Sequence, residues 1–177
     1  MRYLIALPLQ ESEYSEFIKL RDKYRHFAPR WKITLDPHIT LYRPSEFKIS
    51  KSEAIEEFKR ASSFKQFSVE FKGFEAFMNH SNNAVYSEPI NHTYFEKIKE
   101  LYKPQARNIL QDISDVWPYH PHLTLVNRLD SENAQKLMGE LKKLEFDKTY
   151  TFDRVCLYKK EHEDKDWVEI ASNKLEK

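Results

Sequence analysis

Two copies of one short pattern carry the residues of this chain that are best suited to chemistry. The segment PHITL at 37–41 returns as PHLTL at 121–125. Successive side chains of a strand point to opposite faces, so the histidine and threonine of each copy share one face and the aliphatic residues share the other. If the two strands face one another, two imidazoles and two hydroxyls surround one pocket, which suffices for metal-free acid and base chemistry on a phosphate ester. The candidate catalytic residues are His38 and His122, and the candidate phosphate-binding residues are Thr40 and Thr124.

Several residues near the two motifs are candidates for further substrate contacts. Alternation places Tyr42 on the face of the motif histidine and threonine, where its ring could stack on a base or pack at the edge of a groove. Two arginines follow the motifs and could reach a phosphate or form surface ion pairs. Three more aromatic rings could stack on a base or pack in the core. These arginines are Arg43 and Arg128, and these rings are Phe77, Tyr86 and Tyr119.

His120 opens a metal-binding alternative. His120 and His122 stand two residues apart on one expected strand, and with His38 they could ligate zinc. The first copy has Asp36 where the second has His120, and a zinc site would leave the threonines without a role. The pattern therefore favours a site with no metal and no cofactor, with zinc as the alternative.

Composition limits the classes of function. The chain has 177 residues, which suits one domain with a sizeable core, and its 29 basic and 28 acidic residues give a net charge of +1. So weak an overall charge does not favour tight nonspecific binding to nucleic acid or to a membrane surface. The single cysteine, Cys156, excludes an intrachain disulfide, and the presence of only two glycines excludes a glycine-rich phosphate loop. We expect a cytoplasmic monomer with no membrane segment, no stable protein partner and an inert, buried Cys156.

Hydrophobic periodicity predicts the strands that hold the motifs. The first motif strand should run from about 36 to 42 and end at Pro44. Gly73 should allow a bend within a strand that begins at Phe67, and the polar run around Ser81 should form a hairpin turn. The strands are expected at about 2–7, 36–42, 67–77, 84–87, around 121–125, 150–158 and 167–171.

The helices are predicted from spacing and capping signals. The first helix should cover about 12–26, with Arg21 among the residues that fall on helical spacing. A second helix should begin at Ser50, which has Glu53 in the capping-box position. A third should begin near 91 and be kinked or restarted by Pro104, and a fourth should begin at about 130.

The two halves of the chain share one order of elements, namely strand, helix, motif strand, helix and strand. The motif histidines are 84 residues apart, close to half the chain. This pattern indicates an internal duplication, roughly 1–80 and 81–177, within a single bilobal domain of residues 1–177. A pseudo-twofold axis would bring the motif strands together at the junction of the lobes, where ligand sites tend to lie.

Paired His-x-Thr motifs half a chain apart make this sequence similar to the 2H phosphoesterase superfamily. It resembles the branch of bacterial 2′-5′ RNA ligase and 2′,3′-cyclic nucleotide phosphodiesterase proteins. The opening strand at 2–6, the hairpin segments at 73–77 and 84–86, and the late strand at 152–158 are also like that branch. The resemblance implies an α+β fold of two antiparallel-sheet lobes with outer helices and an active site in the central groove. It also implies that the four motif residues are the catalytic set.

The implied activity is a metal-independent phosphoesterase that acts on cyclic phosphates or 2′-5′ phosphodiester bonds in RNA ends or small nucleotides. One imidazole would take a proton from the attacking water and the other would give one to the departing ribose oxygen. Each threonine hydroxyl would donate to a phosphate oxygen, which is worth on the order of 2–4 kcal/mol in the transition state. The alternative is a module that binds an RNA end or a nucleotide without turnover. The intact histidine pair favours the enzyme, and the sequence does not decide which histidine is the acid.

Overall fold

The computed structural model describes residues 1–79, 83–114 and 118–177. These residues contain nine β-strands, five α-helices and one 3₁₀ helix. The strands are β1 (Arg2–Pro8), β2 (His38–Ser45), β3 (Phe67–Lys72), β4 (Glu75–Phe77), β5 (Asn83–Ser87), β6 (Leu123–Leu129), β7 (Asp147–Phe152), β8 (Arg154–Lys160) and β9 (Val168–Lys174). The helices are α1 (Glu11–Tyr24), α2 (Lys51–Lys59), α3 (Thr93–Leu101), α4 (Lys103–Ile109) and α5 (Ser131–Leu141), and the 3₁₀ helix is η1 (Arg25–Phe27).

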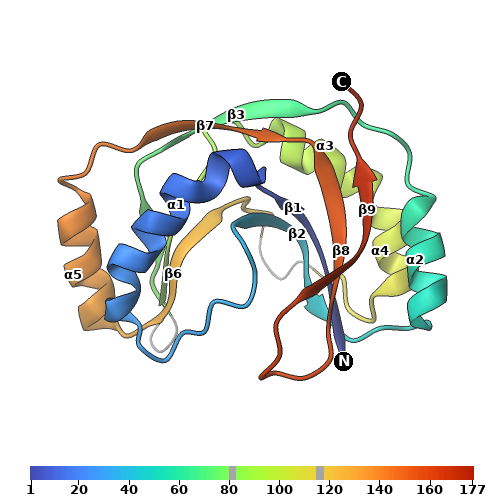
Figure 1. Cartoon of the computed structure of the whole chain (residues 1–177), viewed down its shortest axis with the longest axis horizontal. Coiled ribbons are helices and arrows are strands. Elements are labelled where there is room, and N and C mark those ends of the chain that lie inside the picture. Colours follow the sequence, from blue (N-terminus) through green and yellow to red (C-terminus); the bar gives the residue numbers. More distant parts are fainter. Residues whose placement is uncertain (80–82, 115–117) are drawn as a thin grey trace.

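The two motif strands meet at the centre of a seven-stranded antiparallel sheet with the order β4-β5-β6-β2-β1-β8-β9. β2 and β6 pair through Ile39 and Leu123, the middle residues of the two motifs. The opening strands of the two halves, β1 and β5, lie on either side of this pair, so the strand order repeats about the junction. β3 and β7 form a separate two-stranded sheet along the top of the view in Figure 1. The predicted α+β class and two-lobed architecture are confirmed.

The two halves of the sequence exchange helices across the sheet. α1, from the first half, packs against β6 of the second half, and α3, from the second half, packs against β2. Consequently α1 and α5 lie at one end of the molecule and α2, α3 and α4 lie at the other (Figure 1). The lobes therefore do not coincide with the sequence halves 1–80 and 81–177, since each lobe draws on both.

Local sequence signals mark the starts of α2, α4 and α5, as predicted. The Ser50 hydroxyl accepts a hydrogen bond from the Glu53 amide, and the Glu53 carboxylate accepts one from the Ser50 amide at 2.8 Å, which completes a capping box. Asp130 caps α5 by accepting the Asn133 amide at 2.7 Å. Pro104 lies in the first turn of α4. Amide groups in the first turn of a helix have no acceptor within the helix, so the amide hydrogen that proline lacks costs no hydrogen bond there. A new helix therefore begins at this point, as predicted.

Several predicted strand boundaries are wrong because the chain changes sheet or bulges. The expected strand 150–158 is two strands, β7 and β8, which belong to different sheets. β3 and β4 also belong to different sheets, and Gly73 between them has a φ of 62°, which suits glycine. Pro44 lies inside β2 at an irregularity of the β1–β2 ladder, where the missing amide hydrogen is tolerated. The turn predicted around Ser81 lies outside the described residues, although β4 and β5 pair antiparallel.

Both motif strands bulge at the leucine that ends the motif. The β1–β2 ladder shifts by one residue at Leu41, and the β5–β6 ladder shifts by one residue at Leu125. A bulge interrupts the alternation of side chains and re-aims the next residue. Leu41 and Tyr42 are accordingly both buried in the core, as are Leu125 and Val126. For this reason the prediction that Tyr42 shares the face of the motif histidine and threonine is wrong.

β1 is covered on both faces. Alternate residues of β1 enter two clusters, because successive side chains point to opposite sides of the sheet. The main core takes Tyr3, Ile5 and Leu7, and a smaller cluster takes Leu4 and Ala6 together with Cys156 and Tyr158. Cys156 is buried, as predicted, and burial raises the pKa of its thiol to about 12. No helix in the described ranges combines the length and the hydrophobicity needed to cross a membrane.

The aromatic cluster around Phe152 generates a stability prediction. The Phe152 ring is fully buried, and its centroid lies 5.4 Å from that of Phe67 and 5.0 Å from that of Phe95. Phe152→Ala should lower the free energy of unfolding by about 3–5 kcal/mol, because it leaves a cavity in a packed core. Chemical denaturation measures this loss. Val168→Ala, at a residue that is 60% exposed, is the control and should change stability by about 0.5 kcal/mol or less. A comparable change in both variants would contradict the prediction.

Candidate active site

One cleft, with a volume of about 270 Å³, is lined by all four motif residues, His38, Thr40, His122 and Thr124. The register explains why they meet. Ile39 and Leu123 are paired and fully buried, so the residues on either side of each point the other way, into the cleft. The two strands run antiparallel, so His38 lies across from Thr124 and Thr40 lies across from His122. Each histidine is therefore beside the threonine of the opposite strand.

Each motif histidine is held by the same kind of backbone contact. Nδ1 of His38 lies 2.7 Å from the carbonyl oxygen of Asp36, and Nδ1 of His122 lies 2.8 Å from that of His120. A carbonyl oxygen only accepts hydrogen bonds, so Nδ1 carries the hydrogen in both rings. Nε2 is therefore the atom that accepts a proton when the ring is neutral and donates one when it is charged. Two rings fixed in this way are suited to paired proton transfer.

The two imidazoles have different electrostatic surroundings. Burial lowers the pKa of His38 to about 4, and the positive charges of Arg21 and His122 act in the same direction, against the hydrogen bond on its Nδ1. Burial also lowers the pKa of His122, and His120 adds to this effect, whereas the hydrogen bond on Nδ1 and the Glu88 carboxylate raise it. His38 is therefore kept neutral beside a cation, and His122 has a carboxylate nearby that helps it to hold a proton.

Sequence reasoning missed Arg21 as a site residue. Its side chain is 3% exposed, lines the cleft and donates to the carbonyl oxygen of Thr124 at 2.9 Å. Burial lowers the pKa of Arg21 to about 10, so it remains a cation at neutral pH. Tyr119 makes the matching contact on the first motif, where its hydroxyl donates to the Thr40 carbonyl oxygen at 3.1 Å. The sequence does carry a signal for this role, because Arg21 lies on the face of α1 that is otherwise apolar and buried.

Most of the remaining lining of the cleft comes from the segment between α1 and β2, from β6 and from the β8–β9 connection. The segment contributes Trp31, Lys32 and Leu35, and the connection contributes Trp167. The Trp167 amide donates to the Thr34 carbonyl oxygen at 3.0 Å, which ties the two segments together. These residues add two indole rings and the side chain of Lys32 to the lining of the cleft that holds the imidazoles. No motif marks them in the sequence, because their proximity to the histidines depends on tertiary structure.

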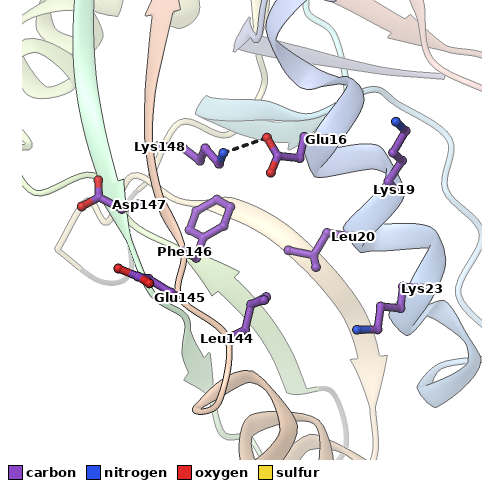
Figure 2. Close-up of a pocket in the computed structure, with 9 residues that line it drawn as sticks. All are labelled: Glu16, Lys19, Leu20, Lys23, Leu144, Glu145, Phe146, Asp147 and Lys148. Carbon is purple, nitrogen blue, oxygen red and sulfur yellow. Dashed lines mark ion pairs between the residues drawn. The ribbon is translucent and has the colours of Figure 1, made fainter.

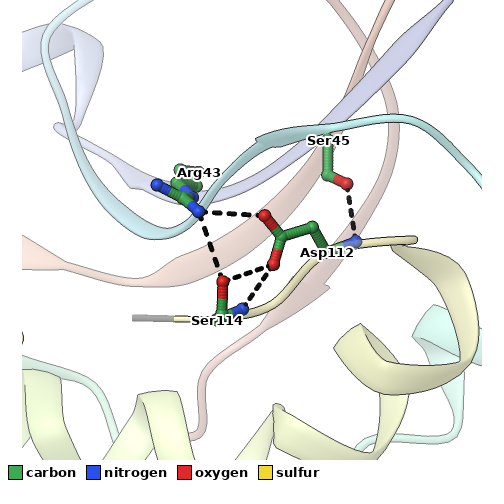
Figure 3. Close-up of polar contacts among 4 residues, drawn as sticks. All are labelled: Arg43, Ser45, Asp112 and Ser114. Atoms are coloured by element: carbon green, nitrogen blue, oxygen red, sulfur yellow. Dashed lines mark hydrogen bonds and ion pairs between the residues drawn. The ribbon is translucent and has the colours of Figure 1, made fainter. Parts of the chain in front are cut away.

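The structure places Tyr42 and Arg43 away from the cleft. Tyr42 is 4% exposed, and its hydroxyl donates to the carbonyl oxygen of Lys99 on α3 at 2.7 Å. Arg43 forms an ion pair with Asp112 at 2.9 Å, within the polar group that Figure 3 shows. Both side chains of this pair are about half exposed, so Arg43 takes the surface ion-pair role rather than the phosphate-binding one.

Phe77 and Tyr86 support His122 rather than opening onto the cleft. Their rings stack with centroids 4.1 Å apart, and Tyr86 is 5% exposed. The centroid of His122 lies 5.0 Å from that of Phe77 and 5.2 Å from that of Tyr86. These contacts hold the imidazole ring of His122 in place, and Tyr86 is too deeply buried to stack on a nucleobase.

His120 faces Glu88 rather than His122. Nε2 of His120 lies 2.7 Å from the Glu88 carboxylate, whereas the rings of His120 and His122 are 6.2 Å apart. Within the described residues, no group of three or more histidine, cysteine, aspartate or glutamate side chains is arranged to hold a metal ion. The geometry therefore gives His120 a different partner from the one that the zinc alternative requires.

A larger cavity, of about 470 Å³, lies between α1 and the segment that leads into β7 (Figure 2). Its apolar lining includes Leu20 and Phe146, and an ion pair between Lys148 and Glu16 lies within it at 2.8 Å. Charges of both signs surround it, and none of the motif residues lines it. The four motif residues all line the smaller cleft instead.

Paired histidine–threonine strands at the centre of a two-lobed antiparallel sheet define the 2H phosphoesterase class of protein. The model of the 2′-5′ RNA ligase superfamily matches residues 10–164. The chain belongs to this superfamily. No curated protein matches the sequence.

Solved structures share the fold over nearly the whole chain. E. coli LigT complexed with 3′-AMP has a TM-score of 0.69 at 16% identity, and TT0787 of Thermus thermophilus has 0.66 at 19%; each comparison covers 99% of this chain and 98% of the other. Kluyveromyces marxianus Usb1 has a TM-score of 0.55 at 9% identity and covers 96% of this chain and 97% of the other. At these identities the likeness shows a common fold.

The charges around His38 generate a prediction for its titration. Nuclear magnetic resonance should find a pKa of about 4 for His38 in the ligand-free protein. Arg21→Met should raise this pKa, because it removes a nearby positive charge. Arg25→Met is the control, because it removes an exposed arginine just after α1, and it should leave the pKa of His38 unchanged. An unchanged titration in both variants would show that Arg21 does not act on the ring.

Proposed function

We propose that this protein is a metal-independent phosphoesterase that hydrolyses 2′,3′-cyclic phosphates or 2′-5′ phosphodiester bonds in RNA ends or small nucleotides. The observation that carries the proposal is the placement of two imidazoles, both with Nδ1 held by a backbone carbonyl, and two threonines in one cleft. Membership of the 2′-5′ RNA ligase superfamily supports a phosphoesterase-type activity. E. coli LigT was solved in complex with 3′-AMP, which supports a nucleotide as a ligand of this chain.

The proposed hydrolysis of a 2′,3′-cyclic phosphate needs two proton transfers. Nε2 of one imidazole accepts a proton from water as the water oxygen bonds to phosphorus. The bond between phosphorus and one ribose oxygen breaks, and Nε2 of the other imidazole gives that oxygen its proton. Thr40 and Thr124 donate to the non-bridging oxygens, whose negative charge grows in the transition state. Arg21 holds the backbone of Thr124 and adds positive charge at the cleft wall.

The surroundings of the two rings favour His38 as the base and His122 as the acid. A base must be neutral before it acts, and burial beside Arg21 keeps His38 neutral. An acid must hold its proton. Burial lowers the pKa of His122, as it does that of His38, and at His122 the Glu88 carboxylate counters this shift. The indole rings of Trp31 and Trp167 supply apolar surfaces for a nucleobase in the same cleft.

Hydrolysis of the four 2′,3′-cyclic mononucleotides in excess EDTA tests this function. The unmodified protein should turn over at least one of them. His38→Ala and His122→Ala should each lower kcat/KM by about two to four orders of magnitude, because each removes one proton-transfer group. His162→Ala, in the exposed β8–β9 connection, is the matched control and should keep the activity.

The other outcomes separate the alternatives. No turnover of any mononucleotide, combined with binding of a short RNA that ends in a cyclic phosphate, would support the non-catalytic binding module. Activity that EDTA abolishes and zinc restores would overturn the metal-free mechanism. Activity that survives in both histidine variants would place the chemistry elsewhere.

Glu88→Gln tests the assignment of His122 as the acid. The change removes a carboxylate that raises the pKa of His122, so this pKa should fall. Because the alkaline limb of the pH profile reports loss of the acid's proton, that limb should move to lower pH while the acidic limb stays in place. His120 and Tyr86 also face His122, and the control Glu96→Gln alters an exposed carboxylate on α3. A shift of the acidic limb instead would reverse the two roles.

A further inference from the structure

A cavity of about 390 Å³ lies at the far end of β9 from the cleft of the motif residues. It is lined by the turn after α2, by Tyr102 between α3 and α4, and by the last residues of β9. Trp167, directly before β9, lines the cleft, whereas Lys174 at the end of β9 lines this cavity. None of the four motif residues belongs to its lining, and its volume is typical of small-molecule sites. The cavity is therefore a candidate for a second ligand.

The lining of this cavity combines positive charge with hydrogen-bond donors. Lys59 and Lys174 supply the charge, and the donors include the hydroxyls of Ser62, Ser63 and Ser172. Among the described residues, no lining side chain carries a carboxylate, although the chain has 28 acidic residues against 29 basic ones. The cavity beside α1, by contrast, has three carboxylates in its lining. The charge of this second cavity therefore favours an anion.

Tyr102 adds a buried hydroxyl whose own hydrogen has no protein acceptor in the described ranges. The residue is 1% exposed, and its oxygen accepts a hydrogen bond from the Asn173 side-chain amide at 3.0 Å. Burial raises the pKa of Tyr102 to about 12, so the hydroxyl keeps its hydrogen at neutral pH. Buried donors are normally hydrogen-bonded, so the unused hydrogen indicates an acceptor that is not part of the chain. Because Tyr102 and Asn173 both line the cavity, that acceptor belongs to a ligand in the cavity.

Hydrogen bonds between distant segments hold the walls of the cavity in place. The Glu176 amide donates to the Phe64 carbonyl oxygen at 2.8 Å, and the Gln66 amide donates to the Glu176 carbonyl oxygen at 2.7 Å. The Asn173 side-chain amide also donates to the carbonyl oxygen of Phe58, in the last turn of α2, at 2.9 Å. Carbonyl oxygens at the end of a helix repel an anion, and this one is already occupied by a donor. The donors of the lining are thus arranged before a ligand binds.

We propose that this cavity binds the phosphate group of a small molecule, at a site separate from the cleft of the motif residues. The Tyr102 hydroxyl donates to one phosphate oxygen, serine hydroxyls donate to the others, and Lys59 and Lys174 balance the negative charge. A phosphate monoester has three strong acceptor oxygens and up to two negative charges, which matches a lining with several donors and two cations. No motif residue takes part, so the inference does not depend on the proposed function.

Titration of the protein with inorganic phosphate, followed by nuclear magnetic resonance at constant ionic strength, tests the proposal. Saturable shifts should appear at the backbone amides of Ser62 and Ser63 and at the side-chain amide of Asn173. The signals of His38 and His122 report separately on phosphate in the cleft of the motif residues. A second titration uses glycerol 3-phosphate. Tighter binding of this ester would assign a phosphorylated organic molecule to the cavity, and tighter binding of inorganic phosphate would assign the free ion.

Two sets of substitutions in the lining should weaken phosphate binding at this site. The double variant Lys59→Gln, Lys174→Gln should bind about tenfold or more weakly, because it removes both cations. Tyr102→Phe should weaken binding about tenfold, because it removes a donor to a charged oxygen and keeps the aromatic ring. The side-chain amide of Asn173 retains its hydrogen bond to the Phe58 carbonyl oxygen in this variant.

Lys97→Gln, Lys142→Gln is the matched control, since it removes the same charge from exposed positions on α3 and just after α5. It should leave the phosphate affinity unchanged. Equal weakening in both double variants would reduce the effect to overall charge and overturn the site. Unchanged affinity in Tyr102→Phe would also overturn it, because the anion would not then reach the buried hydroxyl. Shifts at His38 and His122 without shifts at the cavity residues would place phosphate in the cleft alone, with the same consequence.

Discussion

The antiparallel contact between Ile39 and Leu123 is the constraint on which the rest of the site depends. Both residues are fully buried, and each is flanked by a histidine and a threonine that point the other way. A slip of one residue in either strand would turn the whole motif over and bury the imidazole in the apolar core. Burial of these two aliphatic residues therefore fixes which side chains face the cleft, and the packing of the core and the chemistry of the site are set by the same register.

Contacts that cross between the sequence halves hold this register. Arg21 of the first half donates to the Thr124 carbonyl oxygen, and Tyr119 of the second half donates to the Thr40 carbonyl oxygen. The exchange of α1 and α3 between the two ends of the sheet has the same effect on a larger scale. Since each half supplies the support for the motif of the other, neither half presents a complete site by itself.

Near-identical motifs acquire different properties because their neighbours differ. Both histidines donate from Nδ1 to a backbone carbonyl, so their intrinsic geometry is the same. His38 lies near the Arg21 cation, and His122 lies near the Glu88 carboxylate, beside the stacked rings of Phe77 and Tyr86. Burial thus lowers the pKa of both imidazoles, an arginine adds to this shift at His38, and a carboxylate counters it at His122.

The sequence by itself determined the features that depend on neighbours along the chain. The alternation within each motif, the capping box at Ser50, the cap at Asp130 and the helix restart at Pro104 all follow from interactions within a few residues. The self-similarity of the two motifs also identified the four residues that the structure brings into one cleft.

Only the tertiary structure decided the features that depend on partners far away in the chain. A bulge in the ladder with β1 buries Tyr42, and Arg43 is engaged by Asp112, 69 residues away. Arg21 enters the site because α1 packs against a strand of the other half of the sequence. Periodicity records which face of an element is apolar, but it does not record which element covers that face.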